Sequence, residues 1–217
     1  MNYSKENPSP EYIKLTEDYK KIHQLGTANQ SPKETYNGIS TVFFADILKD
    51  IIKINKCKTL LDYGSGKGDR YFNESFNGSG KKYPPLKDFW DVQPTFFDPG
   101  VPYKKPIGFF FDIVISIDVL EHIPYQDLGW VIDEIFKFSK DIVFINVACY
   151  SATAKLPNGK NAHVSIFNPW WWCGFVEAIA SRYKIKTFLV CTYLENNDRT
   201  KPKNLSYSIN DKFENYT

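Results

Sequence analysis

The sequence predicts an α/β protein whose sheet is doubly wound and mostly parallel, with one antiparallel strand. Three observations indicate this class. Short apolar segments of strand character alternate with longer segments whose apolar residues recur at helical spacing. Segment 111–118 is rich in apolar, β-branched residues, which is typical of a strand covered on both faces. A glycine-rich turn at 64–68 follows the first such segment, where a strand turns sharply into a helix.

Helices are expected ahead of the first strand. A short helix is predicted over 11–24. Ser31, Pro32 and Glu34 form a helix-start pattern, with a Ser cap, Pro in the first turn and Glu three residues after the cap. From 39 to 54 the apolar residues recur at helical spacing, which predicts one amphipathic helix on the sheet edge beside the first strand.

The next elements are a strand, a helix, a loop and two further strands, at 59–63, 68–77, 78–85, 95–97 and 111–118. Between the last two strands only 99–110 remains. That length does not hold a further strand with its helix, since a crossover by itself needs about a dozen residues or more. The sheet is therefore expected to be shortened around its third strand.

The C-terminal part continues the alternation. A helix is predicted at 125–140, a strand at 141–149 and a long loop at 150–167. A helix capped by Asn168 follows, to about residue 183. Two closing strands, at 184–194 and 205–209, would form a hairpin, so one of them is expected to be antiparallel.

Composition limits the class of protein. A length of 217 residues, with 42% hydrophobic and 17% aromatic residues, suits one packed domain spanning 1–217, with the N-terminal helical segment 1–57 on the sheet. The net charge of +2 provides no basic field for a nucleic-acid backbone. The sequence shows no secretory signal and no apolar run long enough to cross a membrane, so we expect a cytoplasmic protein without membrane contact. The four cysteines form no C-x-x-C pair; we interpret them as reduced thiols, and no metal site is expected.

Two segments carry recognisable motifs. Residues 59–68 read Thr-Leu-Leu-Asp-Tyr-Gly-Ser-Gly-Lys-Gly, and Asp69 stands where a dinucleotide fingerprint would have its third glycine. With Asp62 before the first glycine, this stretch resembles motif I of the class I S-adenosylmethionine-dependent methyltransferases. Residues 111–124, Phe-Asp-Ile-Val-Ile-Ser-Ile-Asp-Val-Leu-Glu-His-Ile-Pro, resemble a second segment of that superfamily. The resemblance covers roughly residues 39–194.

The resemblance implies the class I methyltransferase fold, S-adenosylmethionine as cofactor and S-adenosylhomocysteine as product. It also implies methyl transfer to a small-molecule, sugar-like or nucleotide-like acceptor. The glycine turn would hold the amino acid part of the cofactor, with Asp62 near its ammonium group, and Asp98 would accept the ribose hydroxyls. The acid or amide that usually reads the adenine has no obvious counterpart. The expected cofactor-binding residues are Asp62, Tyr63, Gly64, Ser65, Gly66, Gly68, Asp98, Pro99, Asp118, Val119 and Leu120.

Each of these residues also has a purely structural interpretation. The glycines suit any tight strand-to-helix turn, and Asp98 begins an Asp-Pro-Gly sequence that is typical of turns. His122 is a candidate general base, because a neutral imidazole accepts a proton at physiological pH. Alternatively, Glu121 and His122 only shape their loop. Both interpretations stay open at this stage.

The loop after the fifth predicted strand provides a second candidate base, His163, with Asn161 as a possible substrate-facing neighbour. The run at 170–172, three consecutive tryptophans, is either an aromatic wall or core, and we favour core for at least one of them. Tyr19 and His23 either cap the cofactor pocket or lie on a solvated helix face, and the solvated face is favoured.

Three alternatives to a small-molecule methyltransferase remain. The first is a cofactor-binding protein without methyltransferase activity. The second is a nucleic-acid methyltransferase, which is disfavoured because no Asn-Pro-Pro-Tyr or Asp-Pro-Pro-Tyr motif is present; the paired lysines at 81–82 and 104–105 suit solvated surface. The third is a nicotinamide-dependent oxidoreductase, which Asp69 and Arg70 disfavour because they break the required glycine spacing. The sequence does not indicate an oligomeric state.

Overall fold

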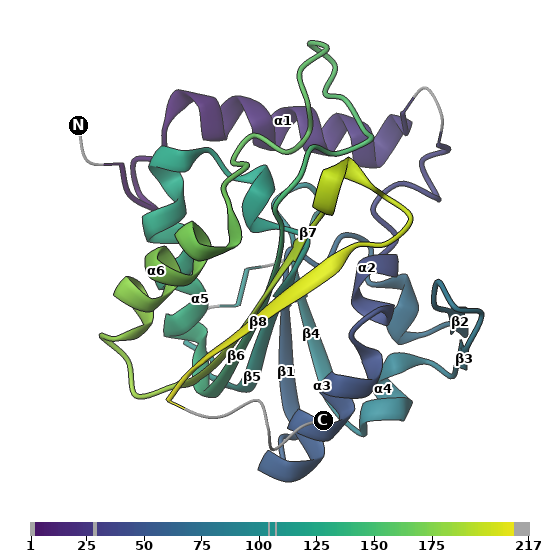
Figure 1. The fold of residues 1–217 in the computed structure, drawn as a ribbon, viewed down its shortest axis with the longest axis vertical. Coiled ribbons are helices and arrows are strands. Elements are labelled where there is room, and N and C mark those ends of the chain that lie inside the picture. The colour runs from purple at the N-terminus through teal and green to yellow at the C-terminus, as the bar shows by residue number, and fades with distance from the viewer. Residues whose placement is uncertain (1–2, 28–29, 104, 107, 211–217) are drawn as a thin grey trace.

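A computed structural model of the chain describes residues 3–27, 30–103, 105–106 and 108–210. At its centre lies a six-stranded sheet (Figure 1). The strands of this sheet are β1 (Thr59–Tyr63), β4 (Gln93–Phe97), β5 (Phe111–Ile117), β6 (Ser139–Ala148), β7 (Lys186–Tyr193) and β8 (Lys203–Ile209). They lie in the order β4-β1-β5-β6-β7-β8, and all neighbours are parallel except β7 and β8. The predicted α/β class, with a mostly parallel sheet and one antiparallel strand, is confirmed.

The strand order reverses beside β1. The chain passes from β1 to β4 on one side and then to β5 on the other. Counting only the parallel strands, this is the doubly wound order 2-1-3-4-5, in which ligands bind beyond the carboxyl ends at the reversal point. The connection from β4 to β5 contains no helix or strand in its described residues. This agrees with the expectation that the sheet is shortened around its third strand.

Helices cover both faces of the sheet. The α-helices are α1 (Pro10–Leu25), α2 (Ile39–Val42), α3 (Ala45–Asn55), α4 (Leu86–Trp90), α5 (Leu128–Phe138) and α6 (Pro169–Ala180). Neighbouring residues of a strand point to opposite faces. Leu61 therefore packs in the cluster with α5 and α6, whereas Leu60 packs in the cluster with α3 and α4.

Helix α1 does not cover a face; it lies across the carboxyl ends of the strands (Figure 1). Its start is capped by Ser9, whose hydroxyl accepts the N–H of Tyr12 and donates to the buried carboxylate of Asp127. The backbone N–H of Ser9 also donates to Asp127, at 3.0 Å. These bonds attach α1 to the start of α5, and so place its side chains over the sheet edge.

The predicted helix at 39–54 is interrupted. Phe44 has φ −104° and ψ 9°, so α2 ends and α3 begins on either side of it. The helix-start pattern at Ser31 does form its capping bonds, because both the hydroxyl and the N–H of Ser31 donate to Glu34. The chain then leaves the helical conformation at Tyr36, where φ is +49°. Only one turn forms there.

The helix predicted at 68–77 is wrong. A 3-10 turn, η1 (Asp69–Tyr71), takes its place, followed by the hairpin strands β2 (Ser75–Phe76) and β3 (Lys82–Tyr83), so the predicted loop 78–85 includes a strand. Tyr71 turns into the core and donates its hydroxyl to Asp62 at 2.9 Å. The segment has no apolar repeat at helical spacing that would favour a longer helix.

Two further observations concern the cysteines and the length of the helices. Cys57, Cys173 and Cys191 are buried, Cys149 is partly buried, and all four are free thiols, as predicted. Among the described helices, none combines the length and the apolar character that crossing a bilayer requires. Short 3-10 turns, η2 (Leu120–His122), η3 (Tyr125–Asp127) and η4 (Glu195–Asn197), complete the fold.

Candidate functional site

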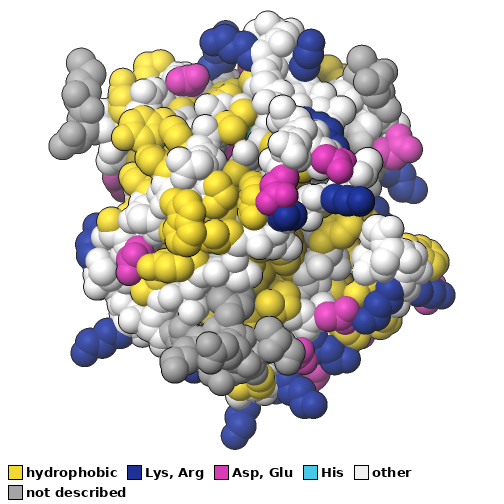
Figure 2. Space-filling view, viewed as in Figure 1, with side chains coloured by type: hydrophobic (Ala, Val, Ile, Leu, Met, Phe, Trp, Pro, Cys, Tyr) yellow, Lys and Arg dark blue, Asp and Glu magenta, His cyan; other side chains and the backbone are white. Residues whose placement is uncertain are grey.

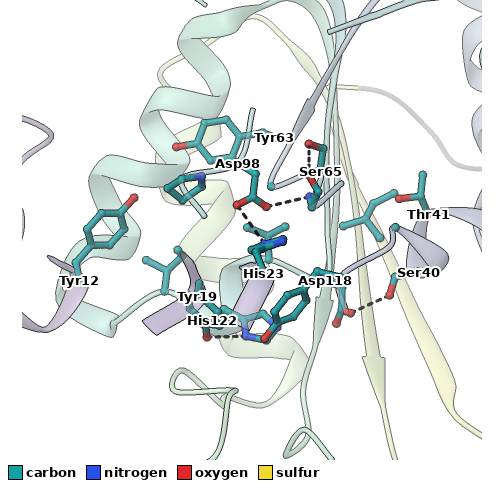
Figure 3. A pocket seen from close by; sticks show the side chains of 18 residues that line it. Tyr12, Tyr19, His23, Ser40, Thr41, Tyr63, Ser65, Asp98, Asp118 and His122 are labelled. Carbon is teal, nitrogen blue, oxygen red and sulfur yellow. Dashed lines mark hydrogen bonds and ion pairs between the residues drawn. The ribbon is translucent and has the colours of Figure 1, made fainter. Parts of the chain in front are cut away.

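A cavity of about 120 Å³ lies at the carboxyl ends of β1, β4 and β5, where the strand order reverses. Helix α1 and the segment around α2 close it from outside (Figure 3). Its lining comes from five parts of the chain: Tyr12, Tyr19 and His23; Tyr36, Gly38, Ser40 and Thr41; Tyr63, Gly64, Ser65 and Gly66; Asp98 and Pro99; and Ile117, Asp118, Val119, His122 and Ile123.

Most of the predicted cofactor residues line this cavity, and three lie elsewhere. Asp62 lies below the turn, fully buried, where it accepts the hydroxyl of Tyr71. Burial raises the pKa of Asp62 to about 7, although the bond from Tyr71 opposes the change. Gly68 packs against the ring of Phe96, and Leu120 belongs to the core between the sheet and α5.

The glycine turn is held by backbone bonds to the end of β4. The N–H groups of Gly64 and Ser65 both donate to the carbonyl of Phe97. Gly64 and Gly66 have φ of +85° and +55°, the left-handed region where glycine is favoured. A Cβ on Gly64 would overlap Val119, and one on Gly66 would overlap the carbonyl of Tyr36. The space provided by these two glycines is therefore filled by other parts of the protein.

Asp98 lies at the end of β4, with its carboxylate beside the glycine turn. One oxygen accepts the N–H of Gly66 at 2.9 Å, and the other accepts the N–H of Gly100 at 2.7 Å. The bond from Gly100 forms the turn that the Asp-Pro-Gly sequence suggested. The bond from Gly66 joins Asp98 to the glycine turn that lines the cavity. Burial raises the pKa of Asp98 above its usual value.

His23 reaches Asp98 from α1, with Nε2 3.8 Å from Oδ1 (Figure 3). Burial, together with the charge of Lys67, lowers the pKa of His23 to about 4. At neutral pH this imidazole is uncharged, so its contact with Asp98 is not an ion pair.

Asp118 lies immediately after β5, with φ +60°, an unusual conformation for a residue other than glycine. Its carboxylate accepts the hydroxyl of Ser40 at 2.8 Å. Burial opposes ionisation of Asp118, but His122 and the bond from Ser40 outweigh it and hold the pKa below its usual value. Backbone strain of this kind gathers at functional sites.

The two candidate bases lie side by side. The rings of His122 and His163 are nearly perpendicular, with centroids 4.7 Å apart. His122 faces the cavity, whereas His163 lies outside the lining and is mostly buried. Burial lowers the pKa of both imidazoles, that of His122 to about 4, so both are uncharged at neutral pH.

Other side chains that the sequence singled out have structural surroundings. The amide of Asn161 bonds both the N–H and the carbonyl of Ala152, and accepts the N–H of His163, which closes the long loop. Of the three tryptophans, Trp172 is entirely buried in the core, as favoured for at least one of them, and Trp170 is 69% exposed.

The expectation that Tyr19 and His23 form a solvated helix face is wrong. Both line the cavity, and Tyr19 contacts His122 through its hydroxyl, 2.9 Å from Nδ1. The signal was present in the sequence: Tyr12, Tyr19 and His23 share one face of a helix at i, i+7 and i+11. Tyr36, Ser40 and Thr41 also line the cavity, and no local pattern points to them.

The electrostatic character of the cavity is acidic. Asp98 and Asp118 contribute carboxylates, while no Lys or Arg lies in the described lining and the imidazoles there are uncharged. A carboxylate in such a place is favoured by a cation or by several hydrogen-bond donors. The cavity therefore suits a cationic or hydroxyl-bearing ligand better than an anionic one.

The lysines considered as phosphate contacts bind acids of this chain. Lys81 pairs with Asp46, and Lys82 pairs with Glu74. Lys105 pairs with Glu134, and Lys104 lies outside the described residues. Figure 2 shows basic side chains scattered among acidic ones over the face in view.

In comparisons with known proteins, no family model, no curated protein and no solved structure matches this chain.

Proposed function

We propose that the protein transfers a methyl group from S-adenosylmethionine to a small-molecule, sugar-like or nucleotide-like acceptor. The observation that carries the proposal is the acidic cavity at the reversal point of the sheet, with Asp98 and Asp118 at the ends of β4 and β5, the strands on either side of β1, and no Lys or Arg in its described lining. S-adenosylmethionine has an ammonium group, a sulfonium centre and two ribose hydroxyls, so it meets these carboxylates with charge and donors of the right kind.

Asp98 is the residue for the ribose. Its two oxygens already accept one backbone N–H each, and a carboxylate has about four acceptor positions, so two acceptor positions remain for the ribose hydroxyls. Asp118 lies across the cavity near the second motif, where its charge favours the cationic part of the cofactor. The sulfonium supplies an activated methyl group, and the protein aligns the acceptor and excludes water.

The outer wall has to adjust for a ligand of this size. A cavity of about 120 Å³ is small beside the roughly 300–1,000 Å³ of most ligand sites. The side chains that narrow it from outside, Tyr19, His23 and Tyr36, belong to α1 and the segment that follows. We therefore expect cofactor binding to move this wall and to change the hydrogen exchange of α1.

A nicotinamide cofactor fits less well. Its pyrophosphate normally binds at the N-terminus of the helix that follows the glycine turn. Here only the 3-10 turn η1 follows, and the nearby carboxylates repel an anion. A cofactor-binding protein without activity remains the competing hypothesis, because the same cavity would serve it.

The test is calorimetric titration with S-adenosylmethionine, S-adenosylhomocysteine and NAD in parallel. We expect micromolar binding of the first two, abolished in Asp98→Ala and weakened in Asp98→Asn. Asp69→Asn, on η1 outside the cavity, is the matched control and should bind as the wild type does. Binding of NAD alone, or of none of the three, would contradict the proposal.

Activity separates an enzyme from a binding protein. Transfer of a labelled methyl group should be measured with sugar, nucleotide, small aromatic and RNA acceptors. Transfer to a low-molecular-weight acceptor is expected. Tight cofactor binding with no transfer to any acceptor would favour the inactive binding protein, and transfer to RNA alone would favour the nucleic-acid alternative.

A further inference from the structure

Asp118, a carboxylate of the expected cofactor site, forms a cluster with the two candidate bases, His122 and His163. Each offers one ligating atom, and these atoms all lie within 4.8 Å of one another. Asp118 follows β5, His122 ends the 3-10 turn η2, and His163 comes from the long loop after β6. We infer that this cluster is a binding site for one divalent transition-metal ion of the kind that imidazole ligands favour.

The hydrogen bonds of the two histidines leave the correct atoms free. Nδ1 of His163 lies 2.5 Å from the carbonyl of Tyr150, and Nδ1 of His122 lies 3.0 Å from the carbonyl of Ala162. A carbonyl only accepts, so each Nδ1 carries the hydrogen and each Nε2 retains its lone pair. Metal-binding histidines are typically oriented in this way, by donating the other ring N–H to a carbonyl or carboxylate.

Tyr19 reinforces the tautomer of His122. Its hydroxyl donates to the same carbonyl of Ala162 at 3.0 Å, which leaves its oxygen free to accept from Nδ1 of His122 at 2.9 Å. The N–H at Nδ1 of His122 is thereby shared between two acceptors, which leaves Nε2 as the atom with a lone pair.

Glu121 is an independent sign that a cation belongs here. It is entirely buried, and its Oε1 accepts the N–H of Ala148 at 2.6 Å. Its Oε2 receives no hydrogen bond from any donor in the described chain. The partly buried carboxylate of Asp118 and the buried carboxyl group of Glu121 are stabilised when a divalent ion compensates the negative charge there.

The spacing requires only a small contraction. Two ligand atoms about 2.1 Å from one ion at a tetrahedral angle lie roughly 3.4 Å apart. The ligating atoms now lie at most 4.8 Å apart. Metal binding would therefore shorten the distance between any two of them by at most roughly 1.4 Å. Two imidazoles and a carboxylate favour Zn²⁺, Co²⁺ or Fe²⁺ over Mg²⁺, which prefers oxygen ligands and bound water.

The site adjoins the cavity without depending on it. Asp118 and His122 line the cavity, and His163 lies behind them. Metal binding is inferred from these residues alone. A role of the ion beside the methyl acceptor would rest on the proposed function. The test therefore measures the affinity for the metal in the absence of any cofactor.

The experiment uses the full chain without a polyhistidine tag, stripped with a chelator. Zn²⁺, Co²⁺ and Mg²⁺ are titrated by calorimetry, and Co²⁺ also by its visible absorption. We expect one Zn²⁺ or Co²⁺ per chain, with weaker binding of Mg²⁺. His122→Ala and His163→Ala should each lower the affinity for Zn²⁺. The loss should be at least as large as the roughly 10- to 100-fold loss seen when a residue that only hydrogen-bonds a metal ligand is removed.

The third histidine of the chain is the matched control. His23→Ala removes an imidazole from the same cavity but not from the cluster, and should keep the affinity for Zn²⁺. Asp118→Asn preserves the shape of its side chain and should weaken Zn²⁺ as the histidine variants do. If a variant does not fold, X-ray absorption of the Zn²⁺-loaded wild type reports the ligands directly, and two imidazoles are expected.

Two results would overturn the inference. One is the absence of stoichiometric binding of both Zn²⁺ and Co²⁺ to the wild type, whether or not Mg²⁺ binds. The other is equal Zn²⁺ affinity in the wild type, His122→Ala and His163→Ala. Either result stands whether or not S-adenosylmethionine binds, so failure of the metal site and failure of the proposed cofactor remain distinguishable.

Discussion

The carboxylate of Asp98 accepts the N–H of Gly66 at 2.9 Å, which joins the end of β4 to the glycine turn that follows β1. The same turn is covered from outside by Tyr36, whose carbonyl accepts the N–H of Lys67. Gly66 thus lies between a carboxylate on one strand and the segment ahead of α2 on the other side. This arrangement makes the turn sensitive to any added side-chain atom.

Gly66→Ala should be more destabilising than Gly80→Ala. Both glycines have positive φ, so an alanine costs about 1–2 kcal/mol at either position. At Gly66 the new methyl group also overlaps the carbonyl of Tyr36, whereas nothing lies near the corresponding position at Gly80. Overpacking adds about 1–3 kcal/mol. Urea unfolding of both variants measures the difference, and equal midpoints would show that the turn is looser than described.

Asp62→Asn should stabilise the protein increasingly as the pH rises. Burial raises the pKa of Asp62 to about 7 in the folded protein, against about 3.9 in an unfolded chain. Between these values the folded state holds more protons, so the stability contributed by this group is complete below about pH 4 and is lost as the pH rises through about 7.

Asparagine keeps an acceptor for the hydroxyl of Tyr71 and has no proton to lose. Its advantage over the wild type should grow from about pH 5 to about pH 8 by more than about 1.4 kcal/mol, the equivalent of one pKa unit. Urea unfolding at several pH values, without cofactor, measures it. A difference that does not change with pH would mean that Asp62 titrates normally.

Ser9→Ala should loosen α1. The variant removes the helix cap and leaves one oxygen of the buried Asp127 without its donor, so a loss of about 1–3 kcal/mol is expected. Ser31→Ala is the matched control, because that cap is exposed and supports a single turn; about 0.5 kcal/mol is expected there. Hydrogen exchange of the α1 amides should quicken in Ser9→Ala only. Unchanged exchange would show that other contacts hold the helix.

Trp172→Ala and Trp170→Ala should differ strongly although the residues are close in sequence. Trp172 is fully buried between the sheet and α5, and its removal should cost about 3–5 kcal/mol. Trp170 is 69% exposed, and its removal should change stability by less than about 0.5 kcal/mol. The midpoints of urea unfolding of the two variants and the wild type measure these losses. A large loss in Trp170→Ala would point to a packing role for the exposed indole.

The strands of the six-stranded sheet and many of the cavity residues could be predicted because they depend on short segments. The boundaries of β1, 59–63, follow from its apolar run and the glycine after it, and Asn168 caps α6 as its sequence indicates. Because parallel strands bring their carboxyl ends to one edge, Gly64, Asp98 and Asp118 could be placed together without knowledge of any contact.

The failures share a different cause. A helix was predicted after Gly68 because strands and helices alternate, yet Tyr71 finds its partner in Asp62 within the core. The break at Phe44 likewise lies within an apolar repeat that continues through it. In neither place does the local pattern decide the outcome: after Gly68 no helical repeat supports the expected helix, and at Phe44 the repeat runs on through the break.

By itself the sequence determined the class of the sheet, the order of its elements along the chain and the strand ends that carry Asp98 and Asp118, because these follow from local patterns of apolar residues and turns. Only the tertiary structure decided that α1 closes the cavity and that His163 lies beside His122. Those relationships join residues far apart in the chain, and they depend on burial and hydrogen bonds that no short segment contains.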